Sequence, residues 1–216
     1  QYQKQLSKKR DKLFEINNLV AKFYHYLLVN KEIGNSSLQY LKNRGFSKTD
    51  IEHFYLGYAP DRWKVLLNFL KNKGYNPEQL VKAGLIQKKR SQYYDRFRGR
   101  IIFPIFNVRD EVLAFGGRIL KEDKSSMPKY LNSPGTLIYN KGDNLYGLNW
   151  ARKQIRQSST AIIMEGYTDV LTAHKEGIEN AVASLGTSLT SSQARLLKRY
   201  ADNIYIAYDA DTAGAQ

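Results

Sequence analysis

The chain has 216 residues, of which 42% are hydrophobic and 12% aromatic, so it can fold around a substantial core of its own. It contains no cysteine, which excludes disulfides and cysteine-based zinc sites within the chain. Its 34 Lys and Arg residues outnumber 20 Asp and Glu residues, which gives a net charge of +14. A basic surface can serve solubility alone, but an excess of this size favours a polyanionic partner such as nucleic acid.

The positive charge is unevenly distributed along the chain. Residues 1–100 carry a net charge of +13, residues 101–160 carry +4, and residues 161–216 carry −3. A basic body joined to an acidic segment fits a protein that handles phosphate groups with the help of a metal ion.

No apolar run reaches the roughly 18–20 residues needed to cross a bilayer, and no signal peptide opens the chain, so we expect a cytoplasmic protein with no membrane partner. The chain starts at Gln1 instead of methionine and stops at Gln216, just after a glycine-containing turn that a helix would follow. We therefore interpret it as a fragment of a longer protein.

Small helices are predicted for the first ninety residues. Residues 11–30 place five apolar side chains on one helical stripe: Leu13, Ile16, Val20, Phe23 and Leu27. The preceding residues 6–10 would be a linker or an extension of this helix. Four further helices are predicted, beginning at Ser36 or Ser37, after Ser47 as an N-cap, after Asp61, and after Asn76 with Pro77 in the first turn.

The pattern changes to strands at about residue 92. Residues 100–108 and 112–117 are predicted strands, joined by a turn at residues 109–111. Pro104 inside the first of these predicts an edge position or a bulge, because proline cannot donate a ladder hydrogen bond. A polar loop follows over residues 121–135, and a helix over residues 145–157.

The last part of the chain alternates strands and helices. Strands are predicted at residues 161–164, 181–184 and 204–208, with helices at 169–176 and 191–200 between them. This β-α-β-α-β order predicts a parallel sheet with right-handed crossovers. The fold class is therefore α/β, with a mixed, basic subdomain over residues 1–158 and a parallel-sheet domain over residues 159–216.

Carboxylates stand where two of these predicted strands end. Glu165 follows the first strand, while Asp209 and Asp211 follow the third. Acids at neighbouring strand ends would repel one another unless a hard divalent cation neutralised them, so this pattern predicts a magnesium site. Asp169 lies at the start of a helix and would support the site. The alternative is that Asp169 and Asp211 only cap helices.

Cations precede this acidic segment. Arg96, Arg98 and Arg100 alternate, so in an extended strand they would form a positive row on one face, suited to phosphate. Arg118 follows two glycines, where the backbone could approach a ligand closely. Lys129, Asn132 and Lys141 lie in or near the polar loop. Each cation could instead be a solvated surface charge. The three histidines show no ligand spacing.

A series of motifs resembles a known family. In chain order they read RFRGRIIFPI (96–105), LAFGGR (113–118), PKYLNSP (128–134), LYGL (145–148), EGYTDV (165–170), ASLGTSLT (183–190) and YDADTAG (208–214). Together they resemble the successive motifs of the bacterial replicative primase, the DnaG family. The glutamate and the Asp-x-Asp pair alone mark a Toprim fold, which topoisomerases and some nucleases share, whereas the arginine strand, FGGR and PKYLNSP are more specific to primases.

The resemblance implies a catalytic core that ends in a Toprim domain, here truncated. Glu165, Asp209 and Asp211 would be catalytic and would hold Mg²⁺ or Mn²⁺, with Asp169 as a further metal residue. Nucleotide and template would be bound by Arg96, Arg98, Arg100, Arg118, Lys129, Asn132 and Lys141. The family's cysteine-rich zinc domain and its helicase-binding C-terminal domain are missing from this sequence.

The leading hypothesis is therefore synthesis of short RNA primers from ribonucleoside triphosphates on a single-stranded DNA template. The fragment is expected to be a monomer that acts at the replication fork, where the longer protein would bind the replicative helicase. One rival is another Toprim enzyme, a nuclease or topoisomerase, although a topoisomerase also needs a tyrosine nucleophile. A second rival is a non-catalytic module that binds single-stranded DNA.

Overall fold

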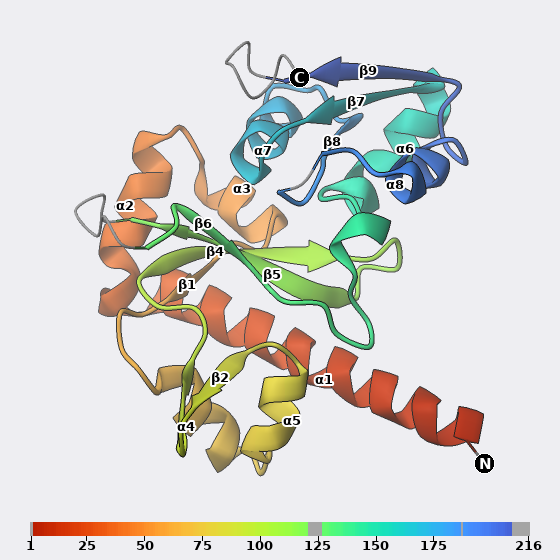
Figure 1. The fold of residues 1–216 in the computed structure, drawn as a ribbon. Helices are drawn as coiled ribbons and strands as arrows, with labels where there is room; N and C mark the ends of the chain where they lie inside the picture. The colour runs from red at the N-terminus through yellow and green to blue at the C-terminus, as the bar shows by residue number, and fades with distance from the viewer. Residues whose placement is uncertain (1, 121–126, 187, 209–216) are drawn as a thin grey trace. The chain divides into compact units, whose positions relative to one another are not determined.

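The computed structural model in Figure 1 describes residues 2–120, 127–186 and 188–208. The chain divides into two compact units. Unit 1 comprises residues 1–104 and 112–138, and unit 2 comprises residues 105–111 and 139–216. The predicted boundary between residues 158 and 159 remains a prediction.

The helices of unit 1 follow the predicted order. They are α1 (Tyr2–Asn30), the 3₁₀ helix η1 (Glu32–Gly34), α2 (Asn35–Asn43), α3 (Lys48–His53), α4 (Val65–Asn72) and α5 (Pro77–Lys82). The opening residues extend α1, and four of the five residues of its predicted stripe are buried. No helix within the described ranges is long and apolar enough to span a bilayer.

Side-chain caps begin two of these helices where the sequence predicts them. Ser47 and Asp50 form a reciprocal capping box at α3, with the Asp50 amide donating to Ser47 Oγ over 3.1 Å. Asn76 caps α5 in the same way, with Pro77 as its first residue. The predicted start of α4 after Asp61 is early, because this helix begins only at Val65.

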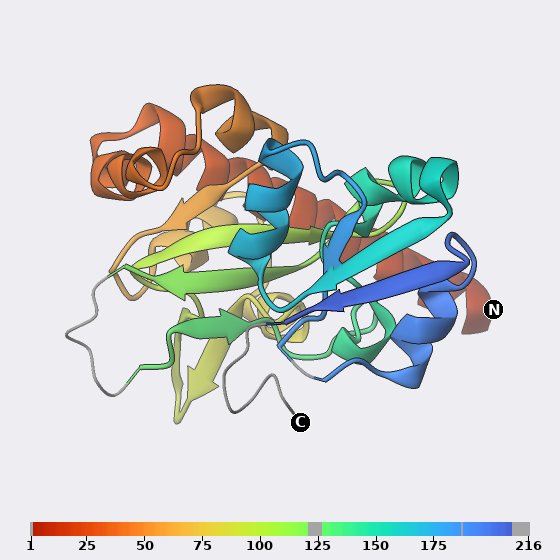
Figure 2. The same cartoon turned by 90° about the horizontal axis from the view of Figure 1, so that it is seen from above.

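A four-stranded sheet lies at the centre of unit 1, in the order β1-β4-β5-β6. Its strands are β1 (Gly57–Ala59), β4 (Arg100–Phe106), β5 (Val112–Ile119) and β6 (Tyr130–Asn132). Helix α1 packs against β1 and β5, and it runs along the sheet in Figures 1 and 2. Asn17 of α1 is buried there and donates a 2.8 Å hydrogen bond to the carbonyl of Leu113.

The position of Pro104 differs from the prediction of an edge strand. Strand β4 lies between β1 and β5, so it is an interior strand of the sheet. Proline is accommodated because β1 is short: its pairing with β4 reaches only Ile102, so Pro104 lies beyond it.

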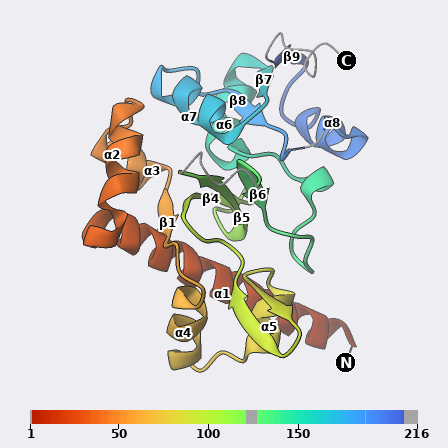
Figure 3. The same cartoon turned by 60° about the vertical axis from the view of Figure 1, so that its left-hand side comes forward.

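A smaller layer of unit 1 consists of α4, α5 and an antiparallel hairpin formed by β2 (Ile86–Lys89) and β3 (Gln92–Asp95). These elements lie together on one side of α1 in Figures 1 and 3. This hairpin is not predicted from the sequence. Its turn residue Arg90 has a positive φ of 54°, a conformation that glycine adopts readily and arginine rarely, so the sequence contains no glycine that would indicate the turn.

Unit 2 has the predicted β-α-β-α-β order. Its elements are the 3₁₀ helix η2 (Lys141–Asp143), α6 (Leu148–Ser158), β7 (Thr160–Met164), α7 (Tyr167–Lys175), β8 (Ala181–Ala183), α8 (Ser191–Leu197) and β9 (Asn203–Ala207). The three strands are parallel and lie in the order β8-β7-β9. The core between α6, α8 and the strands contains Leu145, Leu148, Ala151, Ile155, Ala161, Ile163, Val182, Leu197 and Ala201. The α/β fold class is confirmed.

Candidate functional site

The parallel sheet of unit 2 presents an acidic edge. Met164 at the end of β7 is in register with Ala183 of β8 and with Ala207 of β9, so the carboxyl ends of all three strands are level. Glu165 follows Met164 directly, and its side chain is exposed. Ligands of open α/β sheets bind at such an edge.

Asp169 lies beside Glu165, in the first turn of α7. A Cβ atom added to Gly166 would come within 2.9 Å of Asp169 Oδ2, so glycine at this position lets the carboxylate fold back over the turn. Asp169 is exposed, and an acid in the first turn is also favoured by the helix dipole. Helix stabilisation and a metal role are therefore compatible for this residue.

The other two predicted metal residues, Asp209 and Asp211, lie outside the described residues. Strand β9 ends at Ala207, two positions before Asp209. Within the described ranges, no group of three or more His, Asp or Glu side chains is arranged to hold a metal ion. Glu165 and Asp169 do offer exposed carboxylate oxygens, the donor type that a hard divalent cation prefers, so the residues present fit such an ion.

Four of the predicted nucleotide-binding residues meet around β6 in unit 1. Arg96 donates two hydrogen bonds, of 3.3 and 3.0 Å, to the carbonyl of Asn132. Arg118 of β5 pairs in register with Tyr130 of β6, beside the exposed Lys129. We call Arg96, Arg118, Lys129, Tyr130 and Asn132 the β6 cluster.

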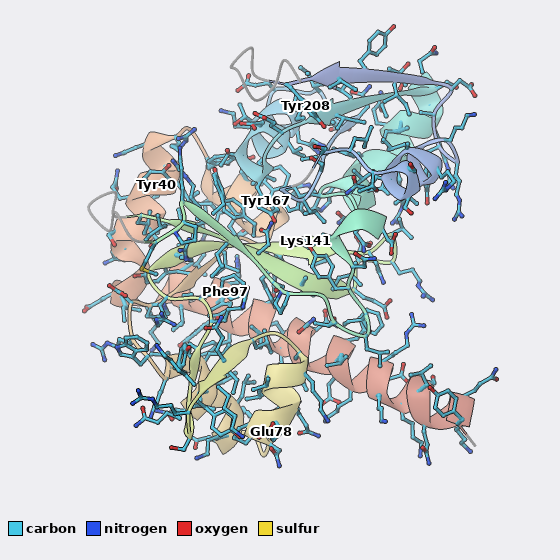
Figure 4. All side chains as sticks on the ribbon, viewed as in Figure 1. Tyr40, Glu78, Phe97, Lys141, Tyr167 and Tyr208 are labelled. Carbon is cyan, nitrogen blue, oxygen red and sulfur yellow. The ribbon has the colours of Figure 1, made fainter. Side chains whose placement is uncertain are left out.

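Arg118 is held in an unusual environment within this cluster. Its guanidinium carbon lies 4.9 Å from the ring centre of Tyr40 on α2 and 5.9 Å from that of Tyr130; Tyr40 is labelled in Figure 4. Its Nε and Nη1 atoms are buried, and among the described residues they have no hydrogen-bond partner. Buried donors without partners are costly, so this guanidinium is suited to an anionic ligand.

The predicted positive row of three arginines is wrong. Gly99 has a φ of +61°, which breaks the extended backbone that the alternation requires. Arg96 therefore turns to β6, whereas Arg98 stacks on aromatic rings elsewhere in unit 1. Arg100 is fully buried and, as it lies here, cannot reach a phosphate.

Arg100 instead supports the segment that carries Lys129. Its guanidinium donates to the carbonyls of Gly117 at 3.1 Å, Lys129 at 3.2 Å and Pro128 at 2.9 Å. The predicted close approach of the backbone at the glycine pair involves the chain itself at Gly117. A Cβ atom on Gly117 would lie 2.8 Å from Phe97 Cδ1 and 3.1 Å from Arg100 Cδ.

A basic and aromatic cleft of unit 1 was not predicted. It has a volume of about 910 Å³ and is lined by Trp63, Lys64, Gln87, Lys89, Arg90, Ser91, Gln92, Tyr93, Tyr94 and Arg98. We call it the Trp63 groove. The Arg98 guanidinium lies 4.3 Å from the Trp63 ring centre and 5.4 Å from that of Tyr94. The Trp63 side chain is 63% exposed, which is unusual for tryptophan.

Lys141 lies in unit 2, in η2, where it is half-buried (Figure 4). Its carbonyl accepts a 3.0 Å hydrogen bond from Gln193 Nε2, which connects η2 to α8.

Two histidines have structural partners: His25 Nδ1 contacts the carbonyl of Leu56, and His174 Nε2 contacts the carbonyl of Ala181.

Comparison with known proteins identifies the family. The description "DNA primase catalytic core, N-terminal domain" matches residues 23–152, and "Toprim-like" matches residues 162–216. The chain belongs to the bacterial DnaG primase family. It is 50% identical over 206 residues to the DNA primase of Clostridium acetobutylicum, which covers 95% of this chain and 33% of that protein.

Solved primase structures have the same fold. The RNA polymerase domain of Mycobacterium tuberculosis DnaG is 34% identical, with a TM-score of 0.88 and coverage of 94% of this chain and 68% of that one. A DnaG catalytic domain bound to single-stranded DNA is 41% identical, with a TM-score of 0.86 and coverage of 96% and 64%. The chain spans about a third of the length of the curated primases that it matches.

The sequence does carry a signal for the Trp63 groove, within a segment predicted as helix. The run Arg62-Trp63-Lys64 places an aromatic residue between two cations, which is a typical composition for a nucleic-acid surface. The hairpin that completes the groove was not recognised, so the residues it contributes could not be grouped with Trp63.

Replacing Arg100 with alanine should lower the free energy of unfolding by about 3 kcal/mol, because three backbone carbonyls lose their donor and a cavity forms where this fully buried side chain lay. Urea denaturation measures this loss. Arg10→Ala, on the exposed first part of α1, is the control and should change stability by less than about 0.5 kcal/mol. Equal effects of the two substitutions would contradict the supporting role of Arg100.

The free energy of unfolding should depend on pH because of Asp95, which lies next to the Trp63 groove. It is buried, and burial raises the pKa of its carboxyl from 3.8 to about 6, although hydrogen bonds from the backbone amides of α4 and the charge of Arg98 lower it. Between about pH 4 and 6 the folded protein binds more protons here than the unfolded chain does. The contribution of Asp95 to the free energy of unfolding therefore falls as pH rises through this window, by on the order of 3 kcal/mol.

Thermal unfolding of wild type and Asp95→Asn at several pH values between 4 and 7 tests this expectation. The asparagine does not titrate, so the stability of wild type relative to the variant should decrease as pH rises. A difference that stays constant across this range would show that Asp95 does not titrate there.

Proposed function

We propose that this chain supplies the catalytic core of a primase that synthesises RNA primers on single-stranded DNA. The observation that carries the proposal is the register of Met164 with Ala207, which brings Glu165 level with the segment that leads into Asp209. In a chain of the DnaG family, an acidic edge of this kind points to nucleotidyl transfer.

The acidic edge would hold a divalent cation, Mg²⁺ or Mn²⁺, through Glu165, Asp209 and Asp211, with Asp169 in support. When bound, the ion would reduce the negative charge at the α-phosphate and favour deprotonation of the primer 3′-hydroxyl. The protein's own contribution would be to hold Glu165 directly after β7, the central strand of the sheet, whose residues Ala161 and Ile163 are buried, so that little rearrangement is needed when the ion arrives.

The β6 cluster would bind the incoming ribonucleoside triphosphate. Arg118 has buried donors without partners among the described residues, and phosphate oxygens would satisfy them. Lys129 is exposed beside it, and Lys141 of unit 2 would be a further nucleotide-binding residue. These cations would stabilise the charge that develops on the leaving pyrophosphate. Arg96 and Arg100 would position β6 and the segment before it through their carbonyl hydrogen bonds.

The Trp63 groove would bind the template. Single-stranded DNA is typically held by cations along its backbone and by aromatic rings that stack on its bases. Trp63 is largely exposed, and Lys64, Lys89 and Arg90 line the same groove. A solved relative of the same family is bound to single-stranded DNA, which supports this assignment.

We also propose where the longer protein acts and which partner it binds. The longer protein would act in the cytoplasm at the replication fork, where its C-terminal domain would contact the replicative helicase and its zinc domain would take part in choosing initiation sites. The 216-residue chain would itself be a monomer.

Ribonucleotide incorporation tests the proposal directly. A chain extended to the length of the solved catalytic cores, incubated with ribonucleoside triphosphates, single-stranded template and Mg²⁺, should make short RNA products that depend on template and on metal. Cleavage or relaxation of DNA without synthesis would favour a Toprim nuclease or topoisomerase. Binding of single-stranded DNA with neither activity, and with no dependence on magnesium, would favour a non-catalytic module.

A further inference from the structure

We propose that Asp95 is a positioning residue for the template surface, a role that rests on the proposed binding of template in the Trp63 groove. Its carboxylate and its backbone together hold Trp63, Tyr94 and Arg98 in one arrangement. We call these three residues the stacking platform.

The carboxylate of Asp95 caps helix α4 from outside the helix. Its Oδ2 accepts a 2.8 Å hydrogen bond from the amide of Leu66, and its Oδ1 accepts one of 2.9 Å from the amide of Leu67. The residue in the N-cap position, Lys64, makes no side-chain cap of its own. Asp95 therefore fixes where α4 begins, and Trp63 lies only two residues before that start.

The backbone of Asp95 holds the other members of the platform. Its amide donates a 2.7 Å hydrogen bond to the carbonyl of Trp63, and its carbonyl accepts one from Nη1 of Arg98. Tyr94 precedes it directly on β3. Asp95 thus connects strand β3 with the start of α4 through its carboxylate and amide, and with Arg98 through its carbonyl.

The result is a preformed cation–aromatic arrangement. The Trp63 and Tyr94 rings meet edge to face, with centres 5.6 Å apart and planes at 78°, and the Arg98 guanidinium lies over both. Trp63 is mostly solvent-exposed, so packing contributes little to its orientation. A platform that is ordered before DNA arrives loses less conformational entropy on binding.

A purely structural alternative assigns Asp95 only to the stability of α4. Both roles predict a lower melting temperature when Asp95 is replaced, so stability alone does not separate them. They differ in the folded protein: only the positioning role predicts that Trp63 becomes more mobile and that DNA affinity falls while the protein remains folded.

The fluorescence of Trp63 separates the two roles without DNA. The chain has two tryptophans, so Trp150→Phe leaves Trp63 as the sole reporter. In this background, acrylamide quenching and anisotropy are measured for Asp95→Asn and Asp95→Ser, well below the melting temperature of each variant. We expect quenching to rise about twofold and anisotropy to fall as the platform loosens.

Asp50→Asn is the matched control, since Asp50 is also an aspartate whose carboxylate serves a helix N-terminus in unit 1, that of α3. It should lower the melting temperature but change neither Trp63 fluorescence nor DNA affinity. For the Asp95 variants, affinity for a single-stranded oligonucleotide should fall about tenfold, since stacking contributes roughly 1–3 kcal/mol per base.

Unchanged Trp63 quenching and anisotropy in a folded Asp95 variant would overturn the positioning role. Failure of the proposed function gives a different result: Trp63→Ala would then leave DNA affinity unaltered, while the Asp95 variants would still loosen Trp63. If Asp95→Ser does not fold, Asp95→Asn decides, because it keeps one carbonyl acceptor for the α4 amides.

Discussion

Replacing Glu165 with alanine should reduce primer synthesis by at least about 100-fold in a chain extended to the length of the solved catalytic cores. The carboxylate follows β7 at the level carboxyl ends of three parallel strands, whereas Asp169 beside it lies in the first turn of a helix, so we expect Asp169 not to substitute for it. Preorganised electrostatic groups of this kind contribute about 10²–10³-fold to rate when removed singly. The measurement is incorporation of labelled ribonucleotides on a single-stranded template, with DNA affinity determined in parallel.

Two further variants make this expectation specific. Glu165→Gln keeps the size of the side chain but removes its charge, and it should be as inactive as the alanine variant. Glu179→Ala removes an exposed carboxylate in the turn before β8 and should retain full activity. Wild-type synthesis by either Glu165 variant would remove this residue from the catalytic assignment. Unchanged DNA affinity in both would show that the loss concerns chemistry and not template binding.

The helices and strands of unit 2 could be predicted from the sequence because apolar runs and helix caps each involve residues that are close together in the chain. Alternating apolar runs and helices predicted a parallel sheet but not the order of its strands, and the level strand ends put Glu165 at the edge where it was expected. The capping boxes at Ser47 and Asn76 were likewise predictable, since cap and amide lie within three residues of each other.

Contacts between distant residues could not be predicted in this way. Alternation placed Arg96, Arg98 and Arg100 on one face, but β3 ends at Asp95 and Gly99 has a positive φ, so the three arginines lie in three different environments. Strand β6 lies in a stretch predicted as a polar loop, because its ladder with β5 and the carbonyl contacts from Arg96 and Arg100 order it from outside. The cap of α4 comes from Asp95, about thirty residues later, which explains why its start was placed too early.

Replacing Trp63 with alanine should weaken binding of single-stranded DNA by about 5- to 150-fold, the equivalent of roughly 1–3 kcal/mol for a stacked base. Fluorescence anisotropy of a labelled oligonucleotide at several salt concentrations measures this loss. The salt dependence distinguishes the two components of the Trp63 groove. Trp63→Ala removes stacking and no charge, so the slope of log affinity against log salt should stay the same. Arg98→Ala should weaken binding and reduce the magnitude of that slope by about 0.7, the value for one phosphate contact on a single strand.

The control for this prediction is a second exposed cation–aromatic pair in unit 1. Tyr26 on α1 is 46% exposed, and Lys31 Nζ lies 5.4 Å from its ring centre, yet neither residue lines the Trp63 groove. If any exposed ring beside a lysine or arginine bound DNA, Tyr26→Ala would cost as much affinity as Trp63→Ala. We expect Tyr26→Ala to bind like wild type, because binding of a single strand combines a stacking ring with a basic groove, and Tyr26 does not line the groove that holds Lys64, Lys89 and Arg90. Equal losses for the two variants would contradict the groove as the template site and indicate dispersed, non-specific binding instead.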